Sequence, residues 1–118
     1  MTRLQVRVDR WVRICLGDAM RNSIRERCFR FLEESLELVQ ACGLPKDSVL
    51  KLVDYVYARP VGDPPQEVGG VSITLFALCN TVAIDQEAET EHELDRCWKQ
   101  CDQIHDKAHA KPLELRGA

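Results

Sequence analysis

Apolar residues recur at helical spacing through most of this chain. When residues 22–42 are drawn as a helix at about 100° per residue, the apolar side chains share one broad arc and the polar ones fill the opposite arc. Gly43 follows as a helix-ending glycine, and Pro45 prevents the helix from continuing. The pattern predicts an amphipathic helix whose core-facing arc is Cys28, Phe31, Leu32, Leu36, Leu38, Val39 and Cys42.

Four further helices are predicted on the same grounds, and no segment alternates in the way that a half-buried strand requires. A short helix that carries Trp11 ends before Gly17-Asp18, and a last, polar helix precedes Pro112. The expected fold is a single all-α domain over residues 1–118, a bundle of four to five helices. The predicted ranges are 9–16, 46–58, 64–84 and 86–111, with 1–20 forming an N-terminal helix and turn and 112–118 a frayed tail.

The helix predicted over residues 64–84 is apolar nearly all round. Asp63 is placed to cap it and Pro64 occupies its first position. A helix of this kind is buried on most sides, and a chain of 118 residues has few places to bury it. We therefore expect burial against a second subunit, in a homodimer or a homotetramer.

Charge and hydropathy argue against a nucleic-acid-binding protein and against a membrane-spanning protein. The formal net charge is −3, and no run of Lys or Arg offers a nucleic-acid surface. Glycines and polar residues interrupt the longest apolar stretch, 68–84, so we expect no membrane span. Residues 1–13 lack the apolar core of a signal peptide, which predicts a cytoplasmic protein.

The chain holds six cysteines, most of them at apolar helical positions. Without a targeting signal, this predicts reduced core thiols rather than disulfides. Cys97, Cys101, His105 and His109 recur every four residues. That spacing drifts by about 40° per step around a helix, so the four side chains cannot meet at one tetrahedral zinc ion and no zinc site is expected.

Three carboxylates lie within five residues on the 22–42 helix: Glu33, Glu34 and Glu37. Spacings of three and four residues put them on one face, where like charges repel and a cation would be stabilising. Glu67 lies in the first turns of the apolar helix and needs a partner if it is buried. Two interpretations stay open: a solvated acidic face with Glu67 paired to Arg25 or Arg30, or a shared Mg²⁺ site with oxygen ligands.

The order Glu33-Glu34-x-x-Glu37, then Glu67 at the head of an apolar helix that ends Asn80-Thr81-Val82-Ala83-Ile84-Asp85, resembles a known family. It is similar to the all-α NTP pyrophosphohydrolases, the MazG-like proteins, with dimeric dUTPases and dCTP pyrophosphatases as relatives. Their pattern is E-E-x-x-E followed by E-x-x-D, and the resemblance covers about residues 25–111.

The resemblance implies Mg²⁺-dependent hydrolysis of a nucleoside triphosphate to the monophosphate and pyrophosphate, with Mn²⁺ as the alternative ion. It implies Glu34, Glu37 and Glu67 as metal ligands, and Glu33 as a further ligand or the group that orients the attacking water. Asn80 matches an Asn that lies near the sugar or base in several relatives. Cationic residues would meet the triphosphate, and we expect Arg30, Lys99 and Lys107 in that role.

One position departs from the family pattern, because Gly70 stands where E-x-x-D has its Asp. Three consequences are open. The three Glu residues bind the metal ion with additional waters, or Asp63 or a substrate phosphate replaces the missing carboxylate, or metal binding and catalysis are impaired. The alternative hypothesis is therefore a catalytically weak or inactive relative that binds nucleotides or serves as an oligomeric helical interaction module.

Overall fold

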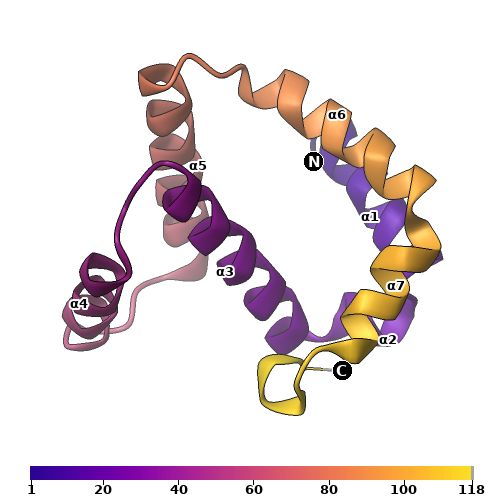
Figure 1. Ribbon diagram of the computed structural model, residues 1–118, viewed down its shortest axis with the longest axis horizontal. Helices are drawn as coiled ribbons and strands as arrows, with labels where there is room; N and C mark the ends of the chain where they lie inside the picture. Colours follow the sequence, from indigo (N-terminus) through magenta and orange to yellow (C-terminus); the bar gives the residue numbers. More distant parts are fainter. Residues whose placement is uncertain (118) are drawn as a thin grey trace. The chain divides into compact units, whose positions relative to one another are not determined.

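The computed structural model describes residues 1–117, which form seven α-helices and one 3₁₀ helix and include no strand (Figure 1). The all-α prediction is therefore confirmed. The helices are α1 (Arg3–Cys15), α2 (Asp18–Asn22), α3 (Ile24–Ala41), α4 (Lys46–Tyr57), α5 (Pro64–Thr81), α6 (Gln86–Lys99) and α7 (Cys101–Ala110), followed by η1 (Leu113–Leu115).

The chain divides into two compact units, and α3 and α6 run from one into the other. The first unit holds residues 1–38 and 92–117, and the second holds residues 39–91. All buried residues among those described lie in the first unit: Val12, Cys15, Met20, Glu26, Leu94 and Ala108. The second unit, which holds all of α4 and α5, has no buried residue.

In the first unit α1 packs on α2 and α7. Asp9 fastens α1 to α2, since its carboxylate accepts hydrogen bonds from Arg21 Nε at 2.7 Å and from Arg13 Nε at 3.0 Å. The bond from Arg21, followed by that from Arg13, lowers the pKa of Asp9 below its ordinary value. The charge on Asp9 is thus retained well into the acidic range.

Helix α1 begins six residues before the predicted start of 9–16. Thr2 caps it, because its Oγ1 accepts a hydrogen bond from the backbone N–H of Gln5 at 3.1 Å. The predicted helix 86–111 is also different, since it is broken into α6 and α7 at Gln100, whose φ of −114° and ψ of 28° are not helical. The break starts α7 at Cys101, and neither glycine nor proline marks it in the sequence.

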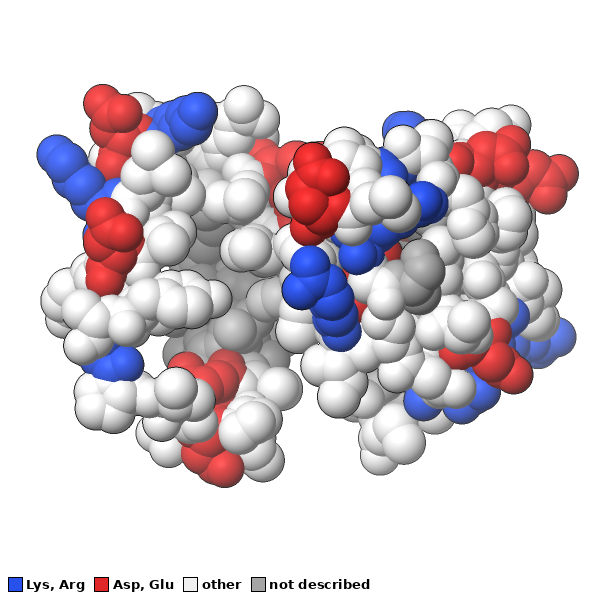
Figure 2. Space-filling model, turned by 90° about the horizontal axis from the view of Figure 1, so that it is seen from below, with Lys and Arg blue, Asp and Glu red and all other residues white. Residues whose placement is uncertain are grey.

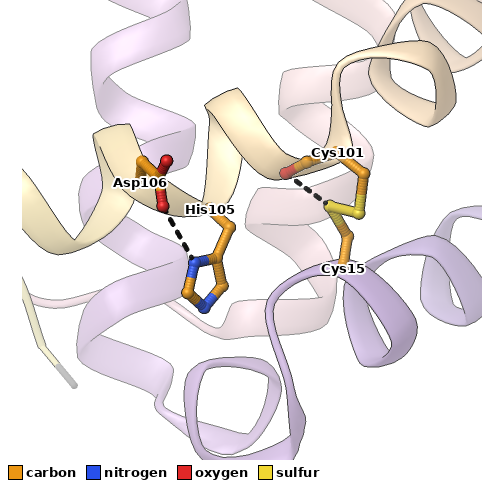
Figure 3. The surroundings of a disulfide bond; sticks show 4 residues. All are labelled: Cys15, Cys101, His105 and Asp106. Atoms are coloured by element: carbon orange, nitrogen blue, oxygen red, sulfur yellow. Dashed lines mark hydrogen bonds and ion pairs between the residues drawn. A yellow bond between two sulfur atoms is a disulfide. The ribbon is translucent and has the colours of Figure 1, made fainter.

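The prediction that all six cysteines are reduced is wrong for two of them. Cys15 at the end of α1 and Cys101 at the start of α7 form a disulfide, with Cα atoms 5.5 Å apart (Figure 3). Sequence separation hid this pair, because the two residues are 86 positions apart in the chain. The remaining four cysteines, Cys28, Cys42, Cys79 and Cys97, are free thiols.

The C-terminal segment, residues 111–117, differs from the frayed tail that we expected. It contains η1 and lies along the first turns of α3 (Figure 1). Gly117 N–H donates to Glu26 Oε1 at 3.1 Å, and Ser23 Oγ donates to the Gly117 carbonyl at 3.1 Å. Ala118 lies outside the described residues.

Helix α5 was expected to be buried on most sides, yet in this single chain its apolar side chains are uncovered. Ile73 is 70% exposed and Phe76 is 50% exposed. No single helix in residues 1–117 is long and apolar enough to cross a membrane; α5 and α6 meet that test only when joined across a bend of 102°. On the face drawn in Figure 2, acidic and basic side chains are interspersed, and neither sign forms a broad patch.

Candidate functional site

Helix α3 carries the three carboxylates of the predicted metal site over little more than one turn. Glu33, Glu34 and Glu37 all belong to the first unit, and Glu33 is half-buried while the other two are exposed. The three side chains differ in their surroundings, and this difference separates their possible roles.

Glu33 is paired inside the protein. Lys111 Nζ lies 3.1 Å from Glu33 Oε1 and 3.2 Å from Oε2, and Arg30 Nη1 lies 3.3 Å from Oε1. A carboxylate held by two cations has little left to gain from binding a metal ion. Its geometry therefore suits a fixed hydrogen-bond acceptor better than a metal ligand.

Arg30, a predicted substrate-binding residue, is engaged in the same network. Its Nε lies 2.9 Å from Oε2 of Glu26, which is 1% exposed, and its guanidinium also donates to the Leu115 carbonyl. Arg27 Nη2 is the second cation near Glu26, at 3.6 Å. A buried carboxylate with these cations is stabilised mainly by them, so Arg30 has a structural role whether or not substrate also reaches it.

Glu34 is surrounded by more negative than positive side chains. Burial raises the pKa of Glu34 above its ordinary value, and the charges of Glu37, Glu93 and Glu33 raise it further, while Arg96 opposes them. Glu93 and Arg96 come from α6, so α6 adds a fourth carboxylate and a guanidinium to the neighbourhood of the α3 acids. A divalent cation beside Glu34 would relieve this repulsion.

Glu93 was not among the site residues predicted from the sequence. Arg96 Nε donates to Glu93 Oε1 at 2.8 Å, and this bond lowers the pKa of Glu93. Cys97 lies beside them, with Sγ 3.8 Å from Glu93 Oε2, and burial together with the Glu93 charge raises the pKa of its thiol. Their i, i+3 and i, i+4 spacings are visible in the sequence, but which helix they approach is decided by the fold.

The other predicted site residues lie apart from this group in the chain or are engaged elsewhere. Glu67 and Asn80 belong to α5 in the second unit, so their part in the site stays a prediction. Glu67 folds its carboxylate back over Gly62, where an added Cβ would overlap its Oε1. Lys99 Nζ lies 2.9 Å from Asp95 Oδ2, and this hydrogen bond raises the pKa of Lys99. Lys107 is exposed on α7.

The carboxylates of α3 are the type of ligand that Mg²⁺ prefers, but they do not form a complete metal-binding site. Across residues 1–117, no three His, Cys, Asp or Glu side chains come together as a metal-binding group. Glu34 and Glu37 supply hard oxygen ligands one turn apart on an exposed helix face. These two carboxylates could supply part of the oxygen ligand set of a Mg²⁺ ion, and no further ligand lies beside them as part of a metal-binding group in the described residues.

A separate cavity of about 420 Å³ opens beside α2 and the start of α3. Its charged groups are already engaged: Arg21 Nη1 donates to Asn22 Oδ1 at 3.1 Å, and Arg27 Nε donates to the Met20 carbonyl at 3.2 Å. The charged groups of the cavity are therefore not available to act with the acidic residues of α3. It is lined by Arg21, Asn22, Ile24, Arg27, Cys28 and Phe31.

Comparisons of this chain with models of protein families, with curated proteins and with solved structures found no match.

Proposed function

We propose that this protein is a Mg²⁺-dependent nucleoside triphosphate pyrophosphohydrolase, which releases pyrophosphate and a nucleoside monophosphate. The observation that carries the proposal is the raised pKa of Glu34, caused by burial and by the neighbouring Glu37, Glu93 and Glu33. Such a surplus of carboxylates costs free energy in the protein alone and is relieved when a divalent cation binds.

In this proposal Glu34 and Glu37 of α3 bind the metal together with Glu67 of α5. Glu33 orients the attacking water, because Lys111 and Arg30 fix its carboxylate as a hydrogen-bond acceptor. Asn80 contacts the sugar or base, and Lys99 and Lys107 meet the phosphates. When bound, Mg²⁺ neutralises the phosphate charge and makes water a better nucleophile.

The test is to incubate purified protein and Mg²⁺ with a panel of ribo- and deoxyribonucleoside triphosphates and to measure pyrophosphate. We expect release from at least one of them, and a loss of about 100-fold or more in kcat for Glu37→Gln, equivalent to about 2.7 kcal/mol. Glu87→Gln is the matched control, since Glu87 is exposed on α6 and outside the site. If no triphosphate is hydrolysed and none binds in the presence of Mg²⁺, the proposal is overturned.

We also propose that a second copy of this chain covers α4 and α5. The supporting observation is the uncovered apolar surface of the second unit, in which Leu50, Leu52, Tyr55, Ile73 and Phe76 are each at least half exposed. Large apolar side chains left exposed in this number are typical of an interaction site. Only one charged residue, Glu67, lies on α5, so like-charge repulsion between copies of that helix is small.

This interface would serve either an active dimeric enzyme or a relative whose role is association alone. Ile73→Glu is expected to convert the assembly to monomers in analytical ultracentrifugation, whereas Ile14→Glu, at an exposed position of α1, leaves it intact. A wild-type protein that sediments as a monomer at micromolar concentration contradicts the interface. Hydrolysis without self-association would separate the enzymatic proposal from this one.

A further inference from the structure

Helix α7 is held at both of its ends. At its start, Cys101 is bonded to Cys15, which is 5% exposed at the end of α1 (Figure 3). Beyond its end, Lys111 pairs with Glu33 at 3.1 Å. Ala108 is the one buried residue of α7, so the apolar contacts of this helix with the core are few.

The segment that follows α7 depends on its position. Residues 111–117 bind α3 through Gly117 N–H on Glu26 Oε1 at 3.1 Å, through Ser23 Oγ on the Gly117 carbonyl at 3.1 Å, and through the Arg30 guanidinium on the Leu115 carbonyl. The fit is close, because a Cβ on Gly117 would overlap the backbone of Arg25 and Glu26. A segment so short and so closely fitted moves when the helix before it moves.

The Cys101 carbonyl beside the disulfide would be a hydrogen-bond acceptor for the Cys15 thiol in the reduced protein. The sulfur of Cys15 lies 3.1 Å from the Cys101 carbonyl oxygen. A disulfide sulfur has no hydrogen to donate, so this is at present only a contact. After reduction the Cys15 S–H has that carbonyl as a ready acceptor, and the buried sulfur keeps a polar partner.

We propose that the Cys15–Cys101 disulfide is a redox-controlled staple, which when closed fixes α7 on α1 and when reduced loosens α7 together with residues 111–117. A weak S–H···O contact then replaces a covalent link, so the helix can move while the rest of the unit stays folded. The inference stands independently of the proposed function.

A small-molecule dithiol reduces the protein disulfide and is itself oxidised to a disulfide. A thiolate of the dithiol attacks one protein sulfur, and the other cysteine leaves as a thiolate that takes up a proton. The second thiol of the reductant then breaks the mixed disulfide, releases the remaining cysteine and becomes a cyclic disulfide. Two electrons pass to the protein, and an oxidised small-molecule disulfide reverses the reaction.

Cys97, one helical turn before Cys101 in the sequence, is the natural competitor for this exchange. Burial and the Glu93 charge raise the pKa of its thiol, which keeps it protonated and slow to attack. Cys97→Ser is therefore the matched control for substitutions of the staple.

The experiment is hydrogen–deuterium exchange by mass spectrometry on the oxidised protein and on the same protein in dithiothreitol. We expect amides of residues 102–117 to exchange at least about fivefold faster after reduction, while residues 46–81 keep their rates. Cys97→Ser should behave as wild type. The double variant Cys15→Ser with Cys101→Ser should resemble the reduced protein with or without dithiothreitol.

Three results would overturn the proposal, and the wild-type comparison needs no variant that might fail to fold. The first is alkylation of six cysteines, rather than the expected four, in the unfolded oxidised protein. The second is unchanged exchange over residues 102–117 after reduction. The third is faster exchange over the whole chain including residues 46–81, which would make the disulfide a global stabiliser instead of a local staple.

Discussion

Lys111 Nζ and Glu33 Oε1 lie 3.1 Å apart, so the residue that follows α7 neutralises the first carboxylate of the acidic run on α3. The pair joins residues 78 positions apart in the chain. It turns Glu33 from a free carboxylate of an acidic face into a fixed member of an ion-pair chain that continues through Arg30 to the buried Glu26.

Replacement of Lys111 by Gln is expected to loosen the C-terminal segment and to lower the free energy of unfolding by about 1 kcal/mol, as for a partly exposed ion pair. Lys111→Arg should keep both properties, since the positive charge remains within reach of Glu33. Hydrogen exchange of residues 112–117 measures the loosening of the segment, and urea unfolding measures the free energy of unfolding. Lys107→Gln removes the same charge from an exposed position of α7, and equal effects of the two substitutions would contradict a specific pairing.

Substitution of Glu34 by Gln is expected to stabilise the protein at pH 7. The folded protein raises the pKa of Glu34, through burial and the charges of Glu37, Glu93 and Glu33, above the ordinary value of 4.5. Ionisation of Glu34 therefore costs the folded state free energy, a cost that grows as the pH rises through 4.5 and is complete above the folded pKa.

Below pH 4 the group is protonated in both states and the difference between wild type and Glu34→Gln should vanish. Urea unfolding at pH 7 and pH 3.5 compares the two proteins, with Glu87→Gln as the control. Added Mg²⁺ should narrow the gap at pH 7, because it stabilises the ionised wild-type carboxylate. A variant that is less stable than wild type at pH 7 in the absence of Mg²⁺ contradicts the inferred repulsion.

The position that departs from the family pattern can be tested directly, because a Cβ at Gly70 would meet nothing within 4 Å. Gly70→Asp therefore fits without displacement of neighbours and restores the E-x-x-D spacing from Glu67. If α5 contributes to a metal site, we expect Mn²⁺ to bind about tenfold more tightly, equivalent to about 1.4 kcal/mol. Isothermal titration calorimetry makes the measurement.

Gly69→Asp is a close control, since position 69 is equally open and lies one residue away on α5. It adds the same charge to the same helix but points it about 100° away from position 70. Equal tightening by both variants would show a general electrostatic effect, and no change in either would leave Gly70 outside any metal site.

Gly117→Ala should detach the C-terminal segment from α3. An added Cβ would overlap backbone atoms of Arg25 and Glu26, which cannot yield as a flexible side chain can. Loss of the Gly117 N–H bond leaves the buried Glu26 short of a donor, and we expect a cost of about 1–3 kcal/mol. Gly69→Ala, in open space within a helix, should instead stabilise by about 0.5–1 kcal/mol. Thermal unfolding of the two variants tests the contrast, and an unperturbed Gly117→Ala contradicts the close fit.

Periodicity predicted α3, α4 and α5 within a few residues, because their apolar positions, the caps around them and the breaks at Gly43, Pro45 and Pro64 are all local signals. The true start of α1 was also readable, since Thr2 and Gln5 form the beginning of a capping pattern. The break between α6 and α7 at Gln100 could not be predicted, because no glycine or proline accompanies it. Local sequence signals therefore predict the boundaries of most helices, but not the division of the last predicted helix into α6 and α7.

The sequence by itself determined the helical class, the placement of Glu33, Glu34 and Glu37 on one helix, and the apolar character of α5, all of which follow from spacing along one segment. Only the tertiary structure decided that Cys15 bonds Cys101 and that Lys111 binds Glu33. It also decided that burial raises the pKa of Glu34 and that Glu93 adds to this effect. These contacts join residues tens of positions apart, and helical periodicity contains no information about which distant helix faces which.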